Sequence, residues 1–356
     1  MSDFSPLLDL PSYPAEGYGR LADRLKPILG TRNDVVFVQG EAILALEAAA
    51  TSLGGPGLVV LNIVTSAYGG YFGSWLERSG ATVHGVAAEP GRPITVEAVK
   101  QALEGLPQVA LVAIVHAETS SGILNPLPEI AALAHARGAL LVVDAVASIG
   151  GHSLDVDALG IDVCVIGPQK ALAGPAGISI ASVSSRAWAA MPARQVSSSL
   201  SLLHLKANWL DRGRGALPGM PSALEFWALE AALDRLEAET LAARIARHQW
   251  AARATRAGLR AFGAELWIEA DGAASALATS VHVRSADARQ IAARARGLGA
   301  AASPGFGAMP DRLVRLDHTG QRAERSAILA NLLGYAMAVG AAFDANVLRS
   351  IVEAAE

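Results

Sequence analysis

A lysine and an aspartate each follow an apolar stretch of the sequence, and together they suggest a reactive site. Asp144 ends the run Leu141–Asp144, and Lys170 lies just beyond the run Val163–Ile166. If both runs are strands of an open α/β sheet, their carboxyl ends open on one crevice, where the two side chains meet. An apolar crevice favours the neutral form of a lysine, whose free amine is a nucleophile toward carbonyl groups.

This pair of residues has the properties that pyridoxal chemistry requires. The amine forms a Schiff base with the aldehyde, and a carboxylate keeps the pyridine nitrogen protonated so that the ring withdraws electrons from the substrate. Taken singly, Lys170 also fits a solvated loop cation, and Asp144 fits a cap of a helix or turn. The neighbours Gly167, Pro168 and Gln169 favour a shaped loop and therefore the chemical interpretation.

Lysine is rare in this chain, which makes Lys170 stand out. Of the 29 Lys and Arg residues, only Lys26, Lys100, Lys170 and Lys206 are lysines. Lys26 and Lys100 fall in amphipathic helical stretches, and we expect Lys206 in a loop, so arginine would serve at all three positions. At Lys170 it would not, because a guanidinium stays protonated and forms no imine.

The surrounding sequence predicts an α/β sheet domain that places these residues. Short apolar runs alternate with helix-length stretches, which is typical of strands in a mostly parallel sheet covered by helices on both faces. The predicted strands are Val35–Val38, Leu58–Val64, Thr82–Ala87, Val109–Val115, Ala139–Val143, Val163–Ile166 and Ile178–Val183. A helix over Leu127–Ala134 shows the apolar spacing expected of one buried face.

After residue 192 the pattern changes and predicts a second, smaller α+β domain. A long helical stretch from about Ser222 to Phe262 leads into it. The predicted elements that follow are a strand at Ala278–Val283, a helix at Ala286–Gly297, a strand at Arg312–Leu316 and a helix at Arg325–Val339. We therefore divide the chain into an N-terminal segment (1–14), a large domain (15–235) and a small C-terminal domain (236–356).

Composition excludes several classes of protein. The 356 residues are 52% hydrophobic and 17% charged, with a net charge of -4. This balance argues against a disordered chain and against a nucleic-acid binder driven by charge. Cys164 is the only cysteine, so an intrachain disulfide and a zinc site built from several thiolates are excluded, and we expect no metal. Without a signal peptide or a run long enough to span a bilayer, we expect a cytoplasmic protein that does not bind membranes.

At this point the sequence resembles a known family. The stretch VVDAVASIGG…DVCVIGPQKALAGPAGISIASVS is similar to the cofactor-lysine region of class V aminotransferases, the alanine–glyoxylate and serine–pyruvate group of the fold type I pyridoxal-phosphate enzymes. The likeness runs from about Val35 to Gly340. It implies a large sheet domain with a smaller C-terminal domain, a homodimer with active sites at its interface, and two small-molecule substrates, an amino donor and a 2-oxo acid.

The resemblance also assigns roles to individual residues. It implies that Lys170 is the catalytic Schiff-base lysine, Asp144 the partner of the pyridine nitrogen, and Gln169 a neighbour of the cofactor. The remaining assignments are Thr119 in HAETSSG as a cofactor contact, Tyr68 as the aromatic ring that stacks on the pyridine, and Arg315 in LVRLDHTG as the arginine that binds the substrate carboxylate. Each has a purely structural alternative: a turn cap for Thr119, a packed turn residue for Tyr68, and an ion pair between the domains for Arg315.

Within the class, the chain resembles the pyridoxamine–pyruvate transaminases. Ordinary members carry a Gly/Ser/Thr-rich turn around the cofactor phosphate, whereas this chain has Gly40-Glu41-Ala42. A carboxylate repels a phosphate dianion, although an acid in a first helical turn is also favourable by itself. Met220 stands where many members have a threonine. Both changes suit a vitamer without phosphate that exchanges as a substrate, but backbone N–H groups alone could also hold a phosphate.

A further departure concerns the acid substrate. Phe306 occupies a Gly-x-Gly turn where the resembling enzymes have a second arginine, so the substrate pocket becomes more apolar. We expect the reaction of pyridoxamine with pyruvate to give pyridoxal and alanine, or a close variant. The alternative is an alanine or serine aminotransferase that uses glyoxylate or pyruvate and keeps pyridoxal 5'-phosphate tightly bound. A non-catalytic vitamer-binding protein is the third possibility.

Two other enzyme classes share this kind of sheet. A dinucleotide-dependent oxidoreductase is disfavoured because Gly54-Gly55-Pro56-Gly57 precedes a predicted strand instead of following one into a helix. A cysteine desulfurase normally uses a mobile cysteine after the lysine, whereas Cys164 precedes Lys170 in a predicted buried strand.

Overall fold

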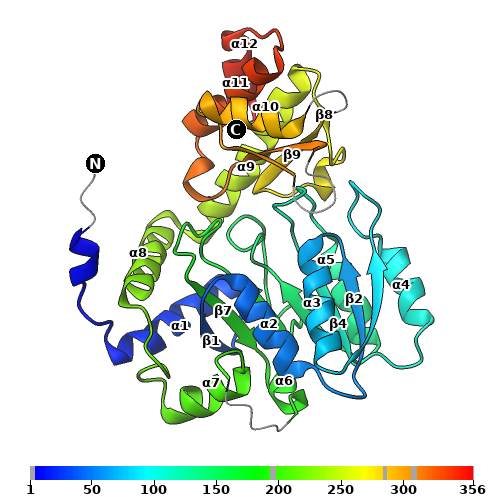
Figure 1. Ribbon diagram of the computed structural model, residues 1–356, viewed down its shortest axis with the longest axis vertical. Helices are drawn as coiled ribbons and strands as arrows, with labels where there is room; N and C mark the ends of the chain where they lie inside the picture. The colour runs from blue at the N-terminus through cyan, green and yellow to red at the C-terminus, as the bar shows by residue number, and fades with distance from the viewer. Residues whose placement is uncertain (1–4, 193–197, 284–286, 306–310, 356) are drawn as a thin grey trace.

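A seven-stranded mixed sheet forms the larger part of the molecule (Figure 1). The computed structural model describes residues 5–192, 198–283, 287–305 and 311–355. The strand order is β1-β7-β6-β5-β4-β2-β3, and β7 is antiparallel to both of its neighbours while the remaining pairs are parallel. The strands are β1 (Asp34–Gln39), β2 (Val59–Val64), β3 (Thr82–Ala87), β4 (Leu111–Val115), β5 (Leu140–Asp144), β6 (Val163–Ile166) and β7 (Ile178–Val183).

All seven predicted strands are present, with ends shifted by two residues at most. Every residue of β4, β5, β6 and β7 is buried, as their unbroken apolar sequences predicted for strands covered on both faces. By contrast, β3 lies at the edge of the sheet and leaves most of its residues exposed, among them Thr82 and His84.

Helices precede, connect and follow the strands of this sheet. They are α1 (Ala15–Leu29), α2 (Ala42–Leu53), α3 (Ala67–Arg78), α4 (Val96–Glu104), α5 (Leu127–Ala136), α6 (Ser185–Ala190), α7 (Leu202–Asn208) and α8 (Ala223–Glu239). Lys26 and Lys100 lie on α1 and α4 as predicted. The expectation of a loop at Lys206 was wrong: Ser201 caps α7 by accepting a hydrogen bond from the His204 backbone N–H, and Lys206 lies on that helix.

A four-stranded antiparallel sheet forms the smaller part of the molecule and lies above the large sheet in Figure 1. Its strand order is β10-β11-β9-β8, and its core gathers residues such as Val281, Val314 and Leu332. Its elements are α9 (Leu241–Ala261), β8 (Glu265–Leu266), β9 (Ala278–His282), α10 (Ala288–Gly297), β10 (Ala302–Pro304), β11 (Leu313–Asp317), α11 (Arg325–Val339) and α12 (Ala345–Ala354). The predicted β9, α10, β11 and α11 are confirmed within two residues.

The stretch predicted as one long helix is two helices, α8 and α9, which break at Thr240. Thr240 has a φ of 75°, in the left-handed region that interrupts a helix, and its hydroxyl accepts a hydrogen bond from the Ala243 backbone N–H to start α9. The division of the chain at residues 235 and 236 stays a prediction.

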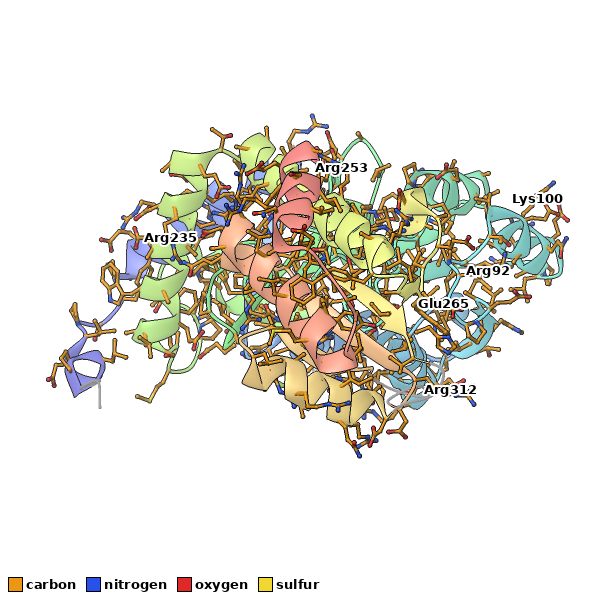
Figure 2. All side chains as sticks on the ribbon, turned by 90° about the horizontal axis from the view of Figure 1, so that it is seen from above. Arg92, Lys100, Arg235, Arg253, Glu265 and Arg312 are labelled. Carbon is orange, nitrogen blue, oxygen red and sulfur yellow. The ribbon has the colours of Figure 1, made fainter. Side chains whose placement is uncertain are left out.

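The few charged side chains lie mostly at the periphery. Figure 2 shows Arg92 and Lys100 at one end of the molecule and Arg235 at the opposite end, and all three are exposed. Within the described residues, no helix is both long and apolar enough to cross a membrane.

Candidate functional site

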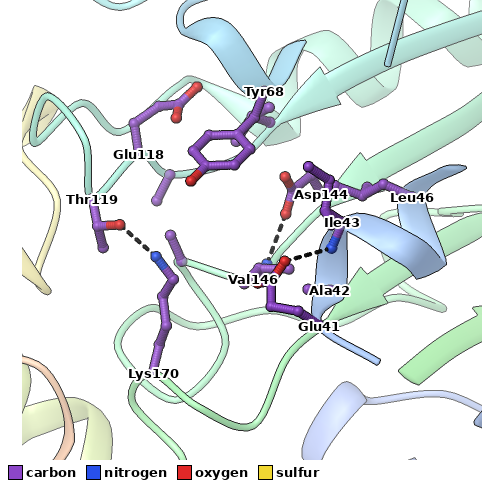
Figure 3. A pocket seen from close by; sticks show the side chains of 13 residues that line it. Glu41, Ala42, Ile43, Leu46, Tyr68, Glu118, Thr119, Asp144, Val146 and Lys170 are labelled. Carbon is purple, nitrogen blue, oxygen red and sulfur yellow. Dashed lines mark hydrogen bonds between the residues drawn. The ribbon is translucent and has the colours of Figure 1, made fainter. Parts of the chain in front are cut away.

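Asp144 and Lys170 meet in one cavity at the carboxyl ends of β5 and β6, as the sequence predicted. The two strands pair in parallel, with Asp144 opposite Val165, so the residues that follow them emerge at the same edge of the sheet. The cavity spans about 380 Å³, a volume that includes its opening to solvent. Its chemically active lining consists of Glu41, Tyr68, Glu118, Thr119, Asp144 and Lys170 (Figure 3).

The amine of Lys170 projects into this cavity from the loop after β6. Its Nζ donates a hydrogen bond to Thr119 Oγ1 at 2.5 Å. Burial lowers the pKa of the lysine, and the positive charge of Arg315 lowers it further, while the charge of Asp144 opposes the shift. The neutral, nucleophilic amine is therefore more accessible here than on an exposed lysine.

Asp144 ends β5 and is buried at the side of the cavity. Its Oδ1 accepts a hydrogen bond from the Val146 backbone N–H at 3.0 Å. Burial raises the pKa of Asp144 from 3.8 to about 7; the Val146 N–H lowers it, and the charges of Glu118 and Glu41 raise it again. A positively charged group placed opposite this carboxyl would favour its ionised form.

Tyr68 lies in the first turn of α3, directly after β2. Ser66 caps this helix by accepting a hydrogen bond from the Tyr68 backbone N–H at 3.2 Å. In the view of Figure 3, the Tyr68 ring and the Lys170 side chain enter the cavity from opposite sides, with Asp144 beside them. Burial raises the pKa of the phenol, which stays protonated at neutral pH. A flat ring bound between these side chains would have an aromatic face to stack on.

Thr119 joins the lysine to the arginine of the second sheet. Its hydroxyl accepts from Lys170, and its backbone carbonyl accepts from Arg315 Nη1 at 3.1 Å. Arg315 lies on β11, where Ser303 of the paired strand β10 accepts from Nε at 3.0 Å. Arg315 does not itself line the cavity, but these two bonds hold its guanidinium next to Thr119 at the cavity edge.

Gly40, Glu41 and Ala42 form the tight connection from β1 into α2. Gly40 has a φ of 136°, and a Cβ there would lie 2.2 Å from Leu44 Cδ1, so the turn requires glycine. Glu41 is the N-cap: one carboxylate oxygen accepts from the Ile43 backbone N–H at 2.9 Å. The other oxygen accepts from Gln169 Nε2 at 2.8 Å. Glu41 is thus both a helix cap and a wall of the cavity. Ala42 also lines the cavity, whereas Gln169 does not and contacts Glu41 through its hydrogen bond.

One predicted substrate-binding residue, Met220, is not brought to this cavity. Its side chain is 96% exposed. Phe306 lies outside the described residues.

Glu118 is the residue that sequence reasoning missed. It is 2% exposed, lines the cavity, and accepts hydrogen bonds from the hydroxyls of Thr65 at 3.0 Å and Ser120 at 3.4 Å. Burial raises the pKa of Glu118. The signal was present in HAETSSG, where an acid directly precedes the predicted contact Thr119.

The residues of the cavity fit a pyridine aldehyde or amine. An amine, a carboxylate and an aromatic ring face the same space, and the remaining walls, which include Leu46, Val115 and Val146, are apolar. Three carboxyl groups, from Glu41, Glu118 and Asp144, accompany one amine, that of Lys170, in this lining. The balance favours a ligand that carries positive charge on its nitrogen atoms.

Cys164, on the central strand β6, is 0% exposed, and burial strongly raises the pKa of its thiol. It is thus a structural core residue, in agreement with the argument against a cysteine desulfurase.

Comparison with known proteins agrees with this geometry. Residues 16–305 match the family model "Aminotransferase class-V". A pyridoxamine–pyruvate transaminase of Mesorhizobium japonicum is 36% identical over 331 residues, which covers 91% of this chain and 84% of the relative. The crystal structure of pyridoxamine–pyruvate aminotransferase from Mesorhizobium loti superposes with a TM-score of 0.89 at 32% identity, over 96% of this chain and 88% of that one. An alanine–glyoxylate aminotransferase from Nostoc sp. shares the fold, with a TM-score of 0.86 at 24% identity over 94% and 91% of the two chains.

Proposed function

The chain belongs to the class V aminotransferases, and on this premise we propose that it transfers the amino group of unphosphorylated pyridoxamine to pyruvate or a similar small 2-oxo acid. The products are pyridoxal and, from pyruvate, alanine. The observation that carries this choice of substrate is the carboxylate of Glu41 at the N-terminus of α2. The two Mesorhizobium relatives, which are named for pyridoxamine and pyruvate, support it.

A helix N-terminus beside a cofactor cavity is the place where a phosphate would be bound, because its backbone N–H groups attract anions. In this chain the Glu41 carboxylate accepts a hydrogen bond from the Ile43 N–H. The first turn of α2 contributes alanine, isoleucine and leucine side chains, which have no hydroxyl to donate to a phosphate. Two like charges about 4 Å apart repel by about 1 kcal/mol in water and about 4 kcal/mol near a protein surface. A phosphate dianion at this helix is therefore disfavoured relative to a neutral hydroxymethyl group.

The protein side chains divide the chemistry among them. When bound, the pyridine ring supplies an electron sink for the substrate carbon. Lys170 binds the aldehyde through Nζ. When its amine is free again, Nζ moves a proton between the α-carbon of the acid substrate and the exocyclic carbon of the vitamer. Asp144 holds positive charge at the ring nitrogen, Tyr68 orients the ring by stacking, and Thr119 fixes the Lys170 amine.

Arg315 is the proposed clamp for the oxo acid. The guanidinium has five N–H groups, of which Nε and Nη1 each use one toward Ser303 and Thr119. Nη2 makes no hydrogen bond among the described residues, so this edge is directed to the carboxylate of the acid. The proposal keeps Phe306 as a substrate-binding residue from the sequence alone, where an apolar side chain stands in place of a second arginine.

The proposal includes a homodimer in the cytoplasm. Exposed Met220 and Tyr71, which is 43% exposed, give apolar surface to a second copy, and the loop around Met220 would reach the partner's cavity. The proposed cytoplasmic location rests on the single cysteine of the sequence, which allows no intrachain disulfide.

The test is to incubate purified protein with pyridoxamine and pyruvate and to quantify both products. The proposal predicts equal amounts of pyridoxal and alanine and no product with Lys170→Ala. If pyridoxamine is not consumed and the protein instead transfers nitrogen from alanine or serine with retained pyridoxal 5'-phosphate, the phosphorylated alternative is correct. Binding of pyridoxal without turnover of either kind would favour a vitamer-binding protein.

A further inference from the structure

We propose that Arg244, a buried arginine on α9, is a positioning residue that holds the backbone next to Lys170. Its Nη1 donates a hydrogen bond to the carbonyl oxygen of Ala171, the residue that follows the lysine, at 2.7 Å. The residue is 4% exposed. The inference rests on the proposed role of Lys170 as the residue that binds the aldehyde.

The Lys170 loop ends in unusual backbone, which explains why it requires an external support. Ala173 adopts a φ of 54°, a conformation that costs a non-glycine residue energy. The loop closes on itself through the Ala173 N–H, which donates to the Lys170 carbonyl at 2.9 Å. Arg244 and Arg235, whose Nη2 donates to the Ala173 carbonyl at 3.0 Å, bind this loop from outside. Two arginines of the α8–α9 pair thus contact alternate carbonyls of the loop.

Glu239 fixes Arg244 in place at the break between α8 and α9. It accepts from Arg244 Nε through one oxygen, and from Arg247 Nε at 2.7 Å through the other. A charged hydrogen bond of this kind is stronger than a neutral one, and Arg247 fixes the carboxylate with a second bond from Nη2 at 3.2 Å. The carboxylate therefore selects the conformation in which Arg244 Nη1 reaches Ala171.

The same cluster holds the turn that follows the Arg315 strand. Arg247 Nη1 donates to the Gly320 carbonyl at 2.7 Å, and the Gly320 N–H donates to His248 Nε2 at 2.9 Å. His248 Nδ1 in turn donates to the Arg244 carbonyl at 2.8 Å, and burial lowers the pKa of His248 to about 3, so its ring stays neutral with the proton on Nδ1.

Gly320 also lies directly against the lysine loop. Its φ is 58°, and a Cβ at this position would lie 3.0 Å from the Lys170 carbonyl oxygen. The cluster of Glu239, Arg244, Arg247 and His248 is therefore a common support for two segments of the site, the loop that carries Lys170 and the turn after Arg315. It sets the position of the amine relative to the guanidinium.

The chain offers a matched control for Arg244 on the same helix. Arg256 is also 4% exposed, and it pairs with Asp271 at 2.6 Å and donates to the Glu269 carbonyl at 2.9 Å. Like Arg244, it is buried, pairs with an acidic side chain and donates to a backbone carbonyl. Its partners lie outside the Lys170 loop. A general effect of removing a buried arginine would appear in both variants.

The experiment measures how fast Lys170 reacts, without turnover. Ligand-free wild type, Arg244→Met and Arg256→Met are mixed with pyridoxal, whose aldehyde condenses with the amine and releases water. Borohydride, added at timed intervals, reduces the adduct to a stable secondary amine, and peptide mass spectrometry quantifies it at Lys170. Because small displacements of a reacting group are costly, Arg244→Met is expected to slow adduct formation by about tenfold or more. Arg256→Met is expected to stay within about twofold of wild type.

Each outcome decides a separate point. A rate for Arg244→Met within about twofold of wild type, or an equal loss in Arg256→Met, overturns the positioning role. If Arg244→Met does not fold, Arg244→Lys is tested in its place. Its single ammonium group keeps the charge but cannot reach Glu239 and Ala171 together, so adduct formation is expected to slow by about threefold or more. A wild-type rate in Arg244→Lys overturns the proposal. Absence of an adduct at Lys170 in wild type contradicts the proposed function instead.

Discussion

At the residue scale, the charges around the cavity determine which ligand it accepts. Glu41, Glu118 and Asp144 bring three carboxyl groups to a lining that contains one amine, Lys170. A phosphate dianion would add to the negative charge, whereas a protonated pyridine nitrogen or an ammonium group would offset it. Burial makes the largest contribution to the raised pKa of Asp144, about 7, and the nearby charges of Glu118 and Glu41 raise it further.

The first prediction concerns Glu41, tested by Glu41→Ser. The serine keeps a cap for α2 and removes the negative charge, so repulsion of a phosphate disappears. We expect the affinity ratio of pyridoxal 5'-phosphate to pyridoxal to rise by about tenfold or more, since 1.4 kcal/mol corresponds to a factor of ten. Absorbance titrations of both vitamers measure the ratio, with Glu97→Ser on α4 as an exposed control. An unchanged ratio would show that Glu41 acts only as a helix cap.

The second prediction concerns the stability of the ligand-free Asp144→Asn variant relative to that of the wild-type protein. The pKa of Asp144 is about 7 in the folded chain and 3.8 in the reference state, so between these values the folded state holds more protons and its stability falls as pH rises. The amide has no charge to bury. We expect the variant to be more stable than wild type at pH 8, by up to roughly 4 kcal/mol, with the gap closing toward pH 4. Urea unfolding at several pH values measures this gap, and a gap independent of pH contradicts the raised pKa.

Two residues of the cavity could be predicted from the sequence pattern itself, because Asp144 ends a recognisable strand and Lys170 lies just beyond the next one. Thr119 and Tyr68 were assigned only through the family resemblance. Glu118 was missed because a lone acid in a loop has no periodic signal, and its burial depends on Thr65, which is distant in sequence. The double role of Glu41 could not be decided locally, since a helix cap and a cavity wall require the same residue type.

At the element scale, turns and breaks account for the differences between prediction and structure. Most strands of the large sheet are short, nearly unbroken apolar runs, so their positions followed from the sequence pattern. Short β10 and β8 have too few residues to show alternation, and they form only because β11 and β9 lie beside them. The break at Thr240 was hidden by strong helix formers on both sides, yet it places Glu239 where it binds Arg244 and Arg247.

The third prediction tests the connection between β1 and α2 with Gly40→Ala. A methyl group at this φ of 136° is strained and meets Leu44 at 2.2 Å. We expect a loss of about 1–3 kcal/mol in unfolding free energy. Gly57→Ala is the control, because Gly57 also has a positive φ, 84°, but no atom lies within 4 Å of its Cβ position. Urea unfolding midpoints of the two variants are compared. If Gly57→Ala loses as much unfolding free energy as Gly40→Ala, the contact with Leu44 contributes nothing to the requirement for glycine at position 40.

At the scale of the whole molecule, the site depends on both sheets. The large sheet contributes the lysine, the aspartate and the tyrosine, while Arg315 comes from the small sheet and contacts Thr119 across the junction. Helix α9 spans this junction, and its N-terminal residues contact both the Lys170 loop and the turn at Gly320. The relative position of amine and guanidinium is therefore a property of the assembled chain.

The most direct test of the central claim is a side-by-side titration of the wild-type protein with pyridoxal and pyridoxal 5'-phosphate. The near-visible absorbance of the Lys170 adduct reports binding of each, and Lys170→Ala gives the baseline. We expect pyridoxal to bind more tightly, by about tenfold or more, because of the charge of Glu41. Tighter binding of the phosphorylated vitamer would contradict the account and identify the chain as an aminotransferase that retains its phosphate cofactor.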